Sequence, residues 1–203
     1  IGDATGHGVG PSLMVSATKM ALMTVDEPNL TERVGKINHL LKEVNSDRLL
    51  NMALTLIELV YDPPSQTVQV KAAGGGMPPL YVLRSHGAVE EIVVKGLPLG
   101  ATERAKYGLT EFTLEQSDLL IAMSDGLPER LNDKDEMLGD ERLAAEIEMV
   151  GKTAQSAKGV LEALVKLGDD WSNNTPQNDD VTLVVLKVRN LQMSKSANLQ
   201  MEA

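Results

Sequence analysis

Apolar residues near the start of the chain recur at intervals of three and four, which is the spacing of an amphipathic helix. This pattern predicts a helix over residues 11–25, with Pro11 suited to its first turn, and a second helix over residues 30–44. We expect the two helices to form a hairpin that lies on a sheet. The apolar face expected for the first helix consists of Leu13, Ala17, Met20, Ala21 and Thr24.

The middle of the chain alternates between apolar runs and turn residues, which is the pattern of successive strands. A nearly continuous apolar run over residues 52–61, bounded by the turn residues 62–64 (DPP), predicts a strand covered on both faces. Residues 67–72 alternate apolar and polar and would complete a hairpin, which the glycines at 74–76 interrupt. Further strands are predicted at residues 80–83, 89–94, 109–114, 119–123 and 181–188.

The last third of the chain returns to helical spacing before one final strand. The spacing predicts helices over residues 140–150 and 154–167. Because helices, strands, helices and a closing strand follow one another in blocks, we expect an α+β domain of packed layers rather than a wound β-α-β sheet. This domain would cover residues 1–188, and the polar, aperiodic residues 189–203 would form a flexible tail.

Composition and charge narrow the classes of function. The chain of 203 residues carries a formal net charge of -10 and few aromatic side chains, which argues against nucleic acid as a partner. It has no cysteine, so disulfides, thiolate zinc sites and cysteine nucleophiles are excluded. No apolar run of about 18 residues predicts a membrane span, and no charged-then-apolar leader opens the sequence. We expect a cytoplasmic protein.

Acidic residues stand at three places where an apolar strand meets a turn. Asp3 precedes a glycine-rich turn, Asp125 follows the strand at residues 119–123, and Asp179 and Asp180 precede the last strand. If these strand ends converge on one edge, their hard oxygen ligands suit Mg²⁺ or Mn²⁺, whereas the scarcity of histidine argues against zinc. The alternative is that each acid only forms its turn, because Asp-Gly pairs are common turn formers.

Five short strings occur in an order and spacing that is typical of one family of enzymes. Together they resemble the SpoIIE/RsbU-type bacterial protein phosphatases, a branch of the metal-dependent PP2C-like (PPM) serine/threonine phosphatases. The resemblance extends from Ile1 to about Val188, and five ordered strings are specific where each alone is not. The strings are residues 2–8 (GDATGHG), 96–100 (GLPLG), 124–129 (SDGLPE), 138–143 (LGDERL) and 179–185 (DDVTLVV).

The resemblance implies an αββα sandwich of two mostly antiparallel sheets flanked by helical layers, with two Mn²⁺ or Mg²⁺ ions at one edge. By position, Asp3 resembles the catalytic carboxylate that bridges both ions, and Ala4 resembles the residue that offers a backbone carbonyl to one of them. Asp125 and Asp179 resemble the other catalytic metal ligands, with Asp180 as the alternative to Asp179. The family has a further strand with a ligand aspartate upstream of Asp3, and we expect this strand to be missing from the chain.

The function that the resemblance implies is hydrolysis of phosphoserine or phosphothreonine by a metal-activated water. The substrate would be a bacterial signalling protein such as a phosphorylated anti-sigma-factor antagonist. Partners would include an upstream sensor or receiver domain, and the resemblance is compatible with a homodimer. The alternative is a catalytically inactive phosphatase-like domain that binds a partner without hydrolysis.

Three smaller motifs each allow a functional and a structural interpretation. His7, next to the expected ions, would either donate a proton during hydrolysis or shape the glycine turn. Residues 151–153 (GKT) resemble the end of a phosphate-binding loop, but Glu146 stands where that loop requires glycine. Residues 132–135 (NDKD) suggest a calcium loop, but Leu138 occupies the position of its sharp-turn glycine, so we expect a solvated turn.

Overall fold

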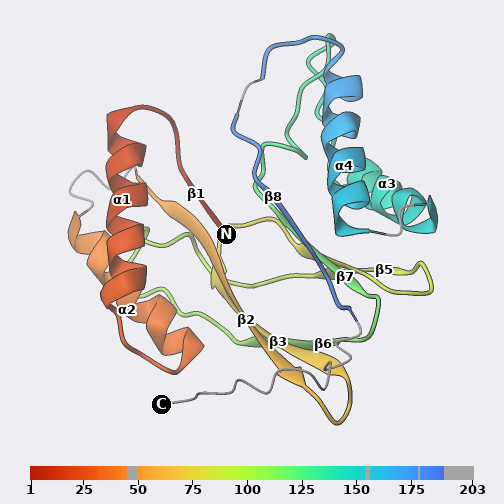
Figure 1. The fold of residues 1–203 in the computed structure, drawn as a ribbon. Helices are drawn as coiled ribbons and strands as arrows, with labels where there is room; N and C mark the ends of the chain where they lie inside the picture. Colours follow the sequence, from red (N-terminus) through yellow and green to blue (C-terminus); the bar gives the residue numbers. More distant parts are fainter. Residues whose placement is uncertain (45–49, 154–155, 178, 190–203) are drawn as a thin grey trace, which may run out of the picture.

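The computed structural model describes residues 1–44, 50–153, 156–177 and 179–189 and contains two β-sheets packed face to face between two pairs of helices (Figure 1). The predicted tail from residue 190 onward, the start of the helix predicted at residue 154 and position 178 lie outside the described residues. In chain order the elements are β1 (Gly2–Ala4), α1 (Val9–Thr24), α2 (Leu30–Val44), β2 (Met52–Asp62), β3 (Thr67–Gly75), β4 (Leu80–Leu83), β5 (Val89–Ile92), β6 (Thr110–Leu114), β7 (Leu119–Met123), α3 (Asp140–Thr153), α4 (Ala157–Ser172) and β8 (Leu183–Lys187).

Each sheet has four strands, and all the pairings in the described residues are antiparallel. The first sheet has the order β1-β2-β3-β6 and carries α1 and α2 on its outer side, while the second has the order β5-β4-β7-β8 and carries α3 and α4 (Figure 1). This arrangement confirms the predicted α+β sandwich of two sheets flanked by helices.

Three apolar clusters fill the three interfaces between the four layers. In β7, Leu119, Ile121 and Met123 pack with residues of α3 and α4, whereas Leu120 and Ala122 pack between the sheets. A strand with both faces covered can bury every side chain, and all five residues of β7 are buried. The uninterrupted apolar sequence of β7 therefore follows from its central place in the sandwich.

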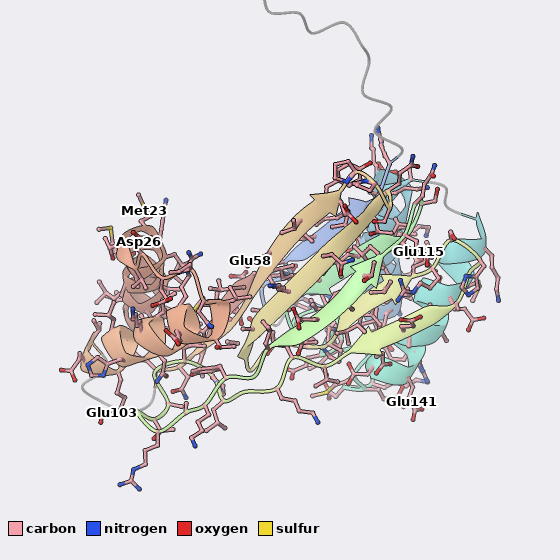
Figure 2. All side chains as sticks on the ribbon, turned by 90° about the horizontal axis from the view of Figure 1, so that it is seen from below. Met23, Asp26, Glu58, Glu103, Glu115 and Glu141 are labelled. Atoms are coloured by element: carbon pink, nitrogen blue, oxygen red, sulfur yellow. The ribbon has the colours of Figure 1, made fainter. Side chains whose placement is uncertain are left out.

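The face of helix α1 that packs on the core is only partly the expected one, because Ala21 is buried and Ala17 packs against the core but other expected residues do not. Met14, Thr18 and Ala21 are its buried residues, whereas Leu13 and Met20 are 60% and 58% exposed. The helix is apolar on several sides, so its periodicity does not select one face; contact with α2 and the first sheet does. Met23, near the end of the same helix, is 73% exposed and is seen at the surface of α1 in Figure 2.

Two expectations for the long hairpin were wrong. Strand β2 is covered on both faces only in its first half, and Leu59 and Val60 near its far end are 45% and 57% exposed, because the α1–α2 core reaches only its first residues. Strand β3 continues through Gly74 and Gly75 instead of ending at Ala72. A Cβ at Gly75 would lie 2.4 Å from the carbonyl carbon of Gly96, so glycine permits this close approach of two backbones.

Helix α4 is longer than the predicted range. It begins after Ser156, whose hydroxyl accepts a hydrogen bond from the Gly159 N–H (3.0 Å), as an N-cap does. It ends at Asn173, whose left-handed backbone (φ 45°) closes the last turn. None of the helices in the described part of the chain has the length and apolar character that crossing a bilayer requires.

A buried ion pair fixes the turn between β6 and β7. The carboxylate of Asp118, which is 1% exposed, accepts hydrogen bonds from Arg84 Nη1 (2.8 Å), Ser85 N (2.8 Å) and Glu115 N (2.9 Å). Arg84 also pairs with Glu90 on the surface. Asp118 precedes β7 and Asp125 follows it, so this network lies at the end of β7 opposite the acidic residues singled out in the sequence.

Candidate metal centre

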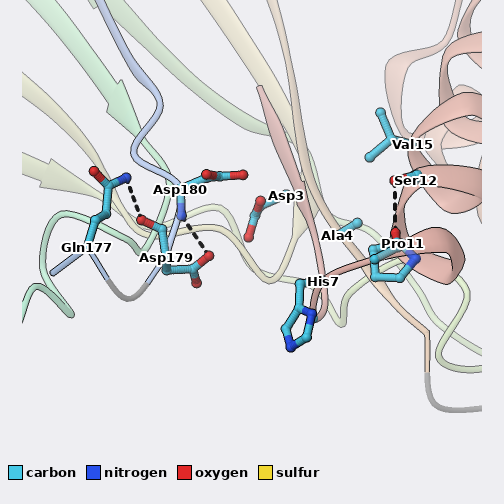
Figure 3. A pocket seen from close by; sticks show the side chains of 11 residues that line it. Asp3, Ala4, His7, Pro11, Ser12, Val15, Gln177, Asp179 and Asp180 are labelled. Atoms are coloured by element: carbon cyan, nitrogen blue, oxygen red, sulfur yellow. Dashed lines mark hydrogen bonds between the residues drawn. The ribbon is translucent and has the colours of Figure 1, made fainter.

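Three acids that are far apart in the sequence converge at one edge of the sandwich. Asp3 lies in β1, Asp125 follows β7, and Asp179 precedes β8. One carboxylate oxygen from each lies within 4.8 Å of the other two. Figure 3 shows Asp3 facing Asp179 and Asp180 across a common space, with His7 beside them. A single divalent cation or a pair of cations could contact all three side chains.

The position of Asp3 follows from the pairing of β1 with β2. Asp3 is opposite Ala53 in this antiparallel pair, and the Thr5 N–H donates to the Asn51 carbonyl (3.0 Å) just beyond it. Gly6 and Gly8 then adopt positive φ angles of 86° and 95°, which residues with a side chain adopt at a cost. The chain thereby turns away from the sheet into α1 and leaves Asp3 at the edge.

The other two acids come from neighbouring strands of the second sheet. Met123 and Leu183 form the last register pair of β7 with β8, and Asp125 and Asp179 lie just beyond it. The Asp180 N–H donates to Asp179 Oδ1 (2.8 Å), and Gln177 Nε2 donates to the Asp179 carbonyl (2.7 Å) (Figure 3). These bonds connect the side chain of Gln177 and the backbone of Asp180 to Asp179.

The acids at this edge repel one another. Burial raises the pKa of Asp3, and the neighbouring charges of Asp125, Asp179 and Asp180 raise it further. Burial also raises the pKa of Glu129, and the charges of Asp125 and Asp179 raise it further by smaller amounts. Asp125 Oδ1 is buried without a hydrogen-bond partner among the described residues. A bound cation would offset this repulsion and satisfy the orphan oxygen, so the donor set fits a hard divalent metal.

A cavity of about 490 Å³ opens beside the acids. His7 and Asp180 line it together with Asp3, and so do Gln177 and Ser12, which the sequence interpretation did not single out. None of the described lining residues is a lysine or arginine. The full set of lining residues is Asp3, Ala4, Gly6, His7, Gly8, Pro11, Ser12, Val15, Gln177, Asp179 and Asp180.

The remaining predicted site residues differ in their placement. Ala4 is buried opposite Met52 in the pairing of β1 with β2 and lines the cavity. Asp180 lines the cavity but is not one of the three acids whose oxygens converge. Nothing in the sequence pattern marked Gln177 as part of the site, because its bond to the Asp179 carbonyl is a contact of the folded chain.

The loop that follows Asp125 is fastened to α4 by Trp171. The indole Nε1 donates to the carbonyls of Arg130 (3.0 Å) and Glu136 (3.2 Å), and the Arg142 guanidinium lies 4.3 Å from the ring centroid. Within the loop, Asn132 Oδ1 accepts from the Lys134 and Glu136 N–H groups. Residues 132–135 therefore form a hydrogen-bonded turn, as expected.

Comparison with known proteins gives a consistent result. The model of the protein family Stage II sporulation protein E (SpoIIE) matches residues 1–189. The phosphoserine phosphatase RsbU of Bacillus subtilis (strain 168) is 25% identical over 189 residues, which cover 92% of this chain and 54% of RsbU. The chain thus spans about half the length of this curated relative.

Two solved structures share the fold. The SiaA-PP2C domain of Pseudomonas aeruginosa superimposes with a TM-score of 0.74 at 21% identity, covering 92% of this chain and 73% of that one. The PP2C phosphatase domain of SpoIIE from Bacillus subtilis superimposes with a TM-score of 0.66 at 19% identity, covering 93% of this chain and 53% of that one. The two sheets and four helices described above are therefore those of a PP2C-like fold.

Proposed function

Since this chain belongs to the SpoIIE family of PP2C-type phosphatase domains, we propose that it is a metal-dependent protein phosphatase that acts on phosphoserine or phosphothreonine. The observation that carries the proposal is the convergence of Asp3, Asp125 and Asp179 within 4.8 Å of one another. Carboxylates alone would repel a phosphate group, so a cluster of this kind is useful to a phosphatase only when cations neutralise it.

We assign the ligands of two Mn²⁺ or Mg²⁺ ions as follows. Asp3 would be a ligand of both ions, the Ala4 backbone carbonyl would be a ligand of one of them, and Asp125 and Asp179 would complete the protein ligands, with Asp180 as the alternative to Asp179. When bound, such ions lower the pKa of a coordinated water and neutralise phosphate charge, which is the chemistry of metal-assisted hydrolysis.

The chain's own residues would then orient the substrate in the cavity beside the acids. The N-terminal turn of α1 borders the cavity through Gly8, Pro11 and Ser12, and it carries no acidic side chain. The positive end of the helix dipole favours an anion there. Both roles considered for His7, proton donation to the leaving oxygen and shaping of the turn, fit its place in the lining.

The proposed substrate class rests on the similarity to RsbU. RsbU is described as a phosphoserine phosphatase, and we propose that the substrate of this chain is likewise a phosphorylated bacterial signalling protein, such as an anti-sigma-factor antagonist. The chain matches about half of RsbU, so we propose that an additional sensor or receiver module regulates the domain. Residues 1–188 would be the catalytic part.

The test is hydrolysis of a phosphoserine peptide in Mn²⁺ and in EDTA. We expect Mn²⁺-dependent release of phosphate by the wild-type protein and none by Asp125→Asn. Asp135→Asn is the matched control, because Asp135 is exposed and its positive φ of 59° is one that asparagine adopts equally well. Full activity of Asp125→Asn would refute the assignment. Mn²⁺ binding without hydrolysis by the wild type would favour the inactive binding domain.

A further inference from the structure

A buried serine connects the two segments of the second sheet that carry acids of the site. Ser124 lies between β7 and Asp125 and is 1% exposed. Its N–H donates to the Thr182 carbonyl (3.0 Å), which continues the pairing of β7 with β8 by one residue. The Thr182 N–H donates to Ser124 Oγ (2.9 Å), and Ser124 Oγ in turn donates to the Asp180 carbonyl (3.1 Å).

This arrangement puts a side-chain oxygen where a β-ladder would use a backbone carbonyl. The backbone of β7 can therefore leave the sheet at Asp125, whose carbonyl accepts from the Glu129 N–H (2.9 Å) in the following turn. At the same time the segment before β8 stays bonded to the end of β7. An alanine at position 124 would offer neither the donor nor the acceptor that this junction uses.

The backbone next to Ser124 also constrains the same segment. A Cβ at Gly126 would lie 2.2 Å from the Asp180 carbonyl oxygen, so the turn after Asp125 packs directly against Asp180. Asp179 is joined to this anchored residue by the bond from the Asp180 N–H to Asp179 Oδ1. A shift of Asp180 would therefore move the Asp179 carboxylate relative to Asp125.

We propose that Ser124 is a positioning residue of the metal centre, which holds Asp179 at cation-binding distance from Asp125 through its bonds to Asp180 and Thr182. The inference rests on the proposed function, because it assigns Ser124 a role toward the same ions. Ser124 itself would not touch the ions or the substrate. Residues behind the direct ligands commonly have this effect, since they fix the geometry in which the ligands meet a metal.

The experiment compares variants of two buried serines. Ser124→Ala removes the hydroxyl at the site, and Ser124→Cys replaces it with a weaker hydrogen-bonding group of similar size. Ser172→Ala is the matched control, because Ser172 is 3% exposed and its hydroxyl donates to a backbone carbonyl, that of Asp169 (2.9 Å), within α4. Mn²⁺ binding is measured by titration calorimetry, folding by circular dichroism, and activity as a function of Mn²⁺ concentration.

We expect Ser124→Ala to raise the Mn²⁺ dissociation constant by about tenfold or more, the range found for residues behind metal ligands. Ser124→Cys should also raise the Mn²⁺ dissociation constant. Ser172→Ala should leave this constant unchanged, even if the substitution lowers thermal stability. Most of the wild-type kcat should return to the Ser124 variants at saturating Mn²⁺. A purely structural role would lower stability without this separation between metal affinity and kcat.

Three results would overturn the inference. These are wild-type Mn²⁺ affinity in a folded Ser124→Ala protein, an equal loss of affinity in Ser172→Ala, or, if Ser124→Ala does not fold, wild-type affinity in Ser124→Cys. In each of these cases the wild-type protein still binds Mn²⁺ and hydrolyses the phosphopeptide. Absence of both activities in the wild type would instead refute the proposed function itself.

Discussion

Asp3 and Asp125 belong to different sheets, and a carboxylate oxygen of each lies within 4.8 Å of the other. Side chains of like charge at this distance destabilise the folded protein unless a proton or a cation intervenes. The relative position of the two sheets therefore sets the geometry of the site. Any cation held there would connect the two halves of the sandwich.

The two neighbouring acids before β8 should differ in importance. The Asp179 oxygen belongs to the converging group and Asp180 does not. Loss of a residue behind a metal ligand costs about 10- to 100-fold, so we expect Asp179→Asn, as loss of a direct ligand, to reduce Mn²⁺-dependent activity by at least about 100-fold and Asp180→Asn to reduce it by much less. Phosphate release at several Mn²⁺ concentrations measures both effects. The reverse order would transfer the ligand role to Asp180.

Removal of the metal should expose the repulsion at Asp3. Because the pKa of Asp3 is raised above its ordinary value of 3.8, its contribution to stability is largest below that pH and is lost as pH rises through the folded-state pKa. In EDTA we expect Asp3→Asn to show a weaker fall in stability above this pH and to match or exceed the wild type at neutral pH. Urea unfolding at several pH values measures this, and a less stable variant in EDTA at neutral pH would contradict it.

The same variant should respond less to added metal. With Mn²⁺ at 100 times its dissociation constant, we expect the wild type to gain about 2.7 kcal/mol of unfolding free energy. Asp3→Asn should gain much less, because it lacks the proposed bridging carboxylate. Equal gains in the two proteins would show that the ion binds elsewhere.

The buried hydroxyl of Tyr81 should cost stability. Tyr81 is 0% exposed and its OH has no hydrogen-bond partner among the described residues, so we expect Tyr81→Phe to stabilise the protein by about 1 kcal/mol. Tyr107→Phe is the matched control of opposite sign, because the Tyr107 OH donates to Asn38 Oδ1 (3.1 Å). Urea unfolding at neutral pH distinguishes the two, and a destabilised Tyr81→Phe protein would contradict the assignment.

Tyr81 also predicts a response to alkaline pH. Burial raises its pKa to about 12, with a smaller effect from Glu91 and Asp140, whereas an unfolded tyrosine ionises near 10. The folded state thus retains the proton longer, and stability should fall between pH 10 and about 12. Tyr81→Phe should reduce this fall, and an identical pH profile for both proteins would contradict the prediction.

The ion pair at the end of β7 opposite the acids should affect the stability of the fold but not metal binding at the site. Asp118→Asn leaves Arg84 without its buried charged partner, so we expect the free energy of unfolding to fall by about 3 kcal/mol. Glu90→Gln removes the exposed partner of the same arginine and should cost less than about 1 kcal/mol. Mn²⁺ affinity should be unchanged in both, and a reduced affinity in folded Asp118→Asn would reveal coupling along the strand.

The sequence predicted most elements because their periodicity is strong and their ends are marked by proline, glycine and asparagine. At α1 it was right for Ala17 and Ala21 but wrong for Leu13 and Met20, and contact with neighbouring elements selects Met14 and Thr18 instead. It also failed at Gly75, because a glycine that ends a strand and one that admits a neighbouring backbone look the same in a sequence.

The residues of the candidate site were likewise predicted only in part. Spacing alone left each acid as either a ligand or a turn former, and the family resemblance selected Asp3, Asp125 and Asp179. The structure brings their oxygens together, and their roles as ligands stay predictions. Ser124 and Gln177 were not predicted, because their bonds to Asp180 and Asp179 depend on how β7 and the segment before β8 meet, which the hydrophobic pattern does not specify in this detail.

Trp171 is the only tryptophan in the chain, and its indole bonds directly to the loop that leaves Asp125. Its fluorescence therefore comes from a single known place, one loop away from the acids. Rearrangement of that loop on cation or substrate binding would alter the polarity around the ring and shift the emission. The protein thus carries an intrinsic optical reporter that requires no label.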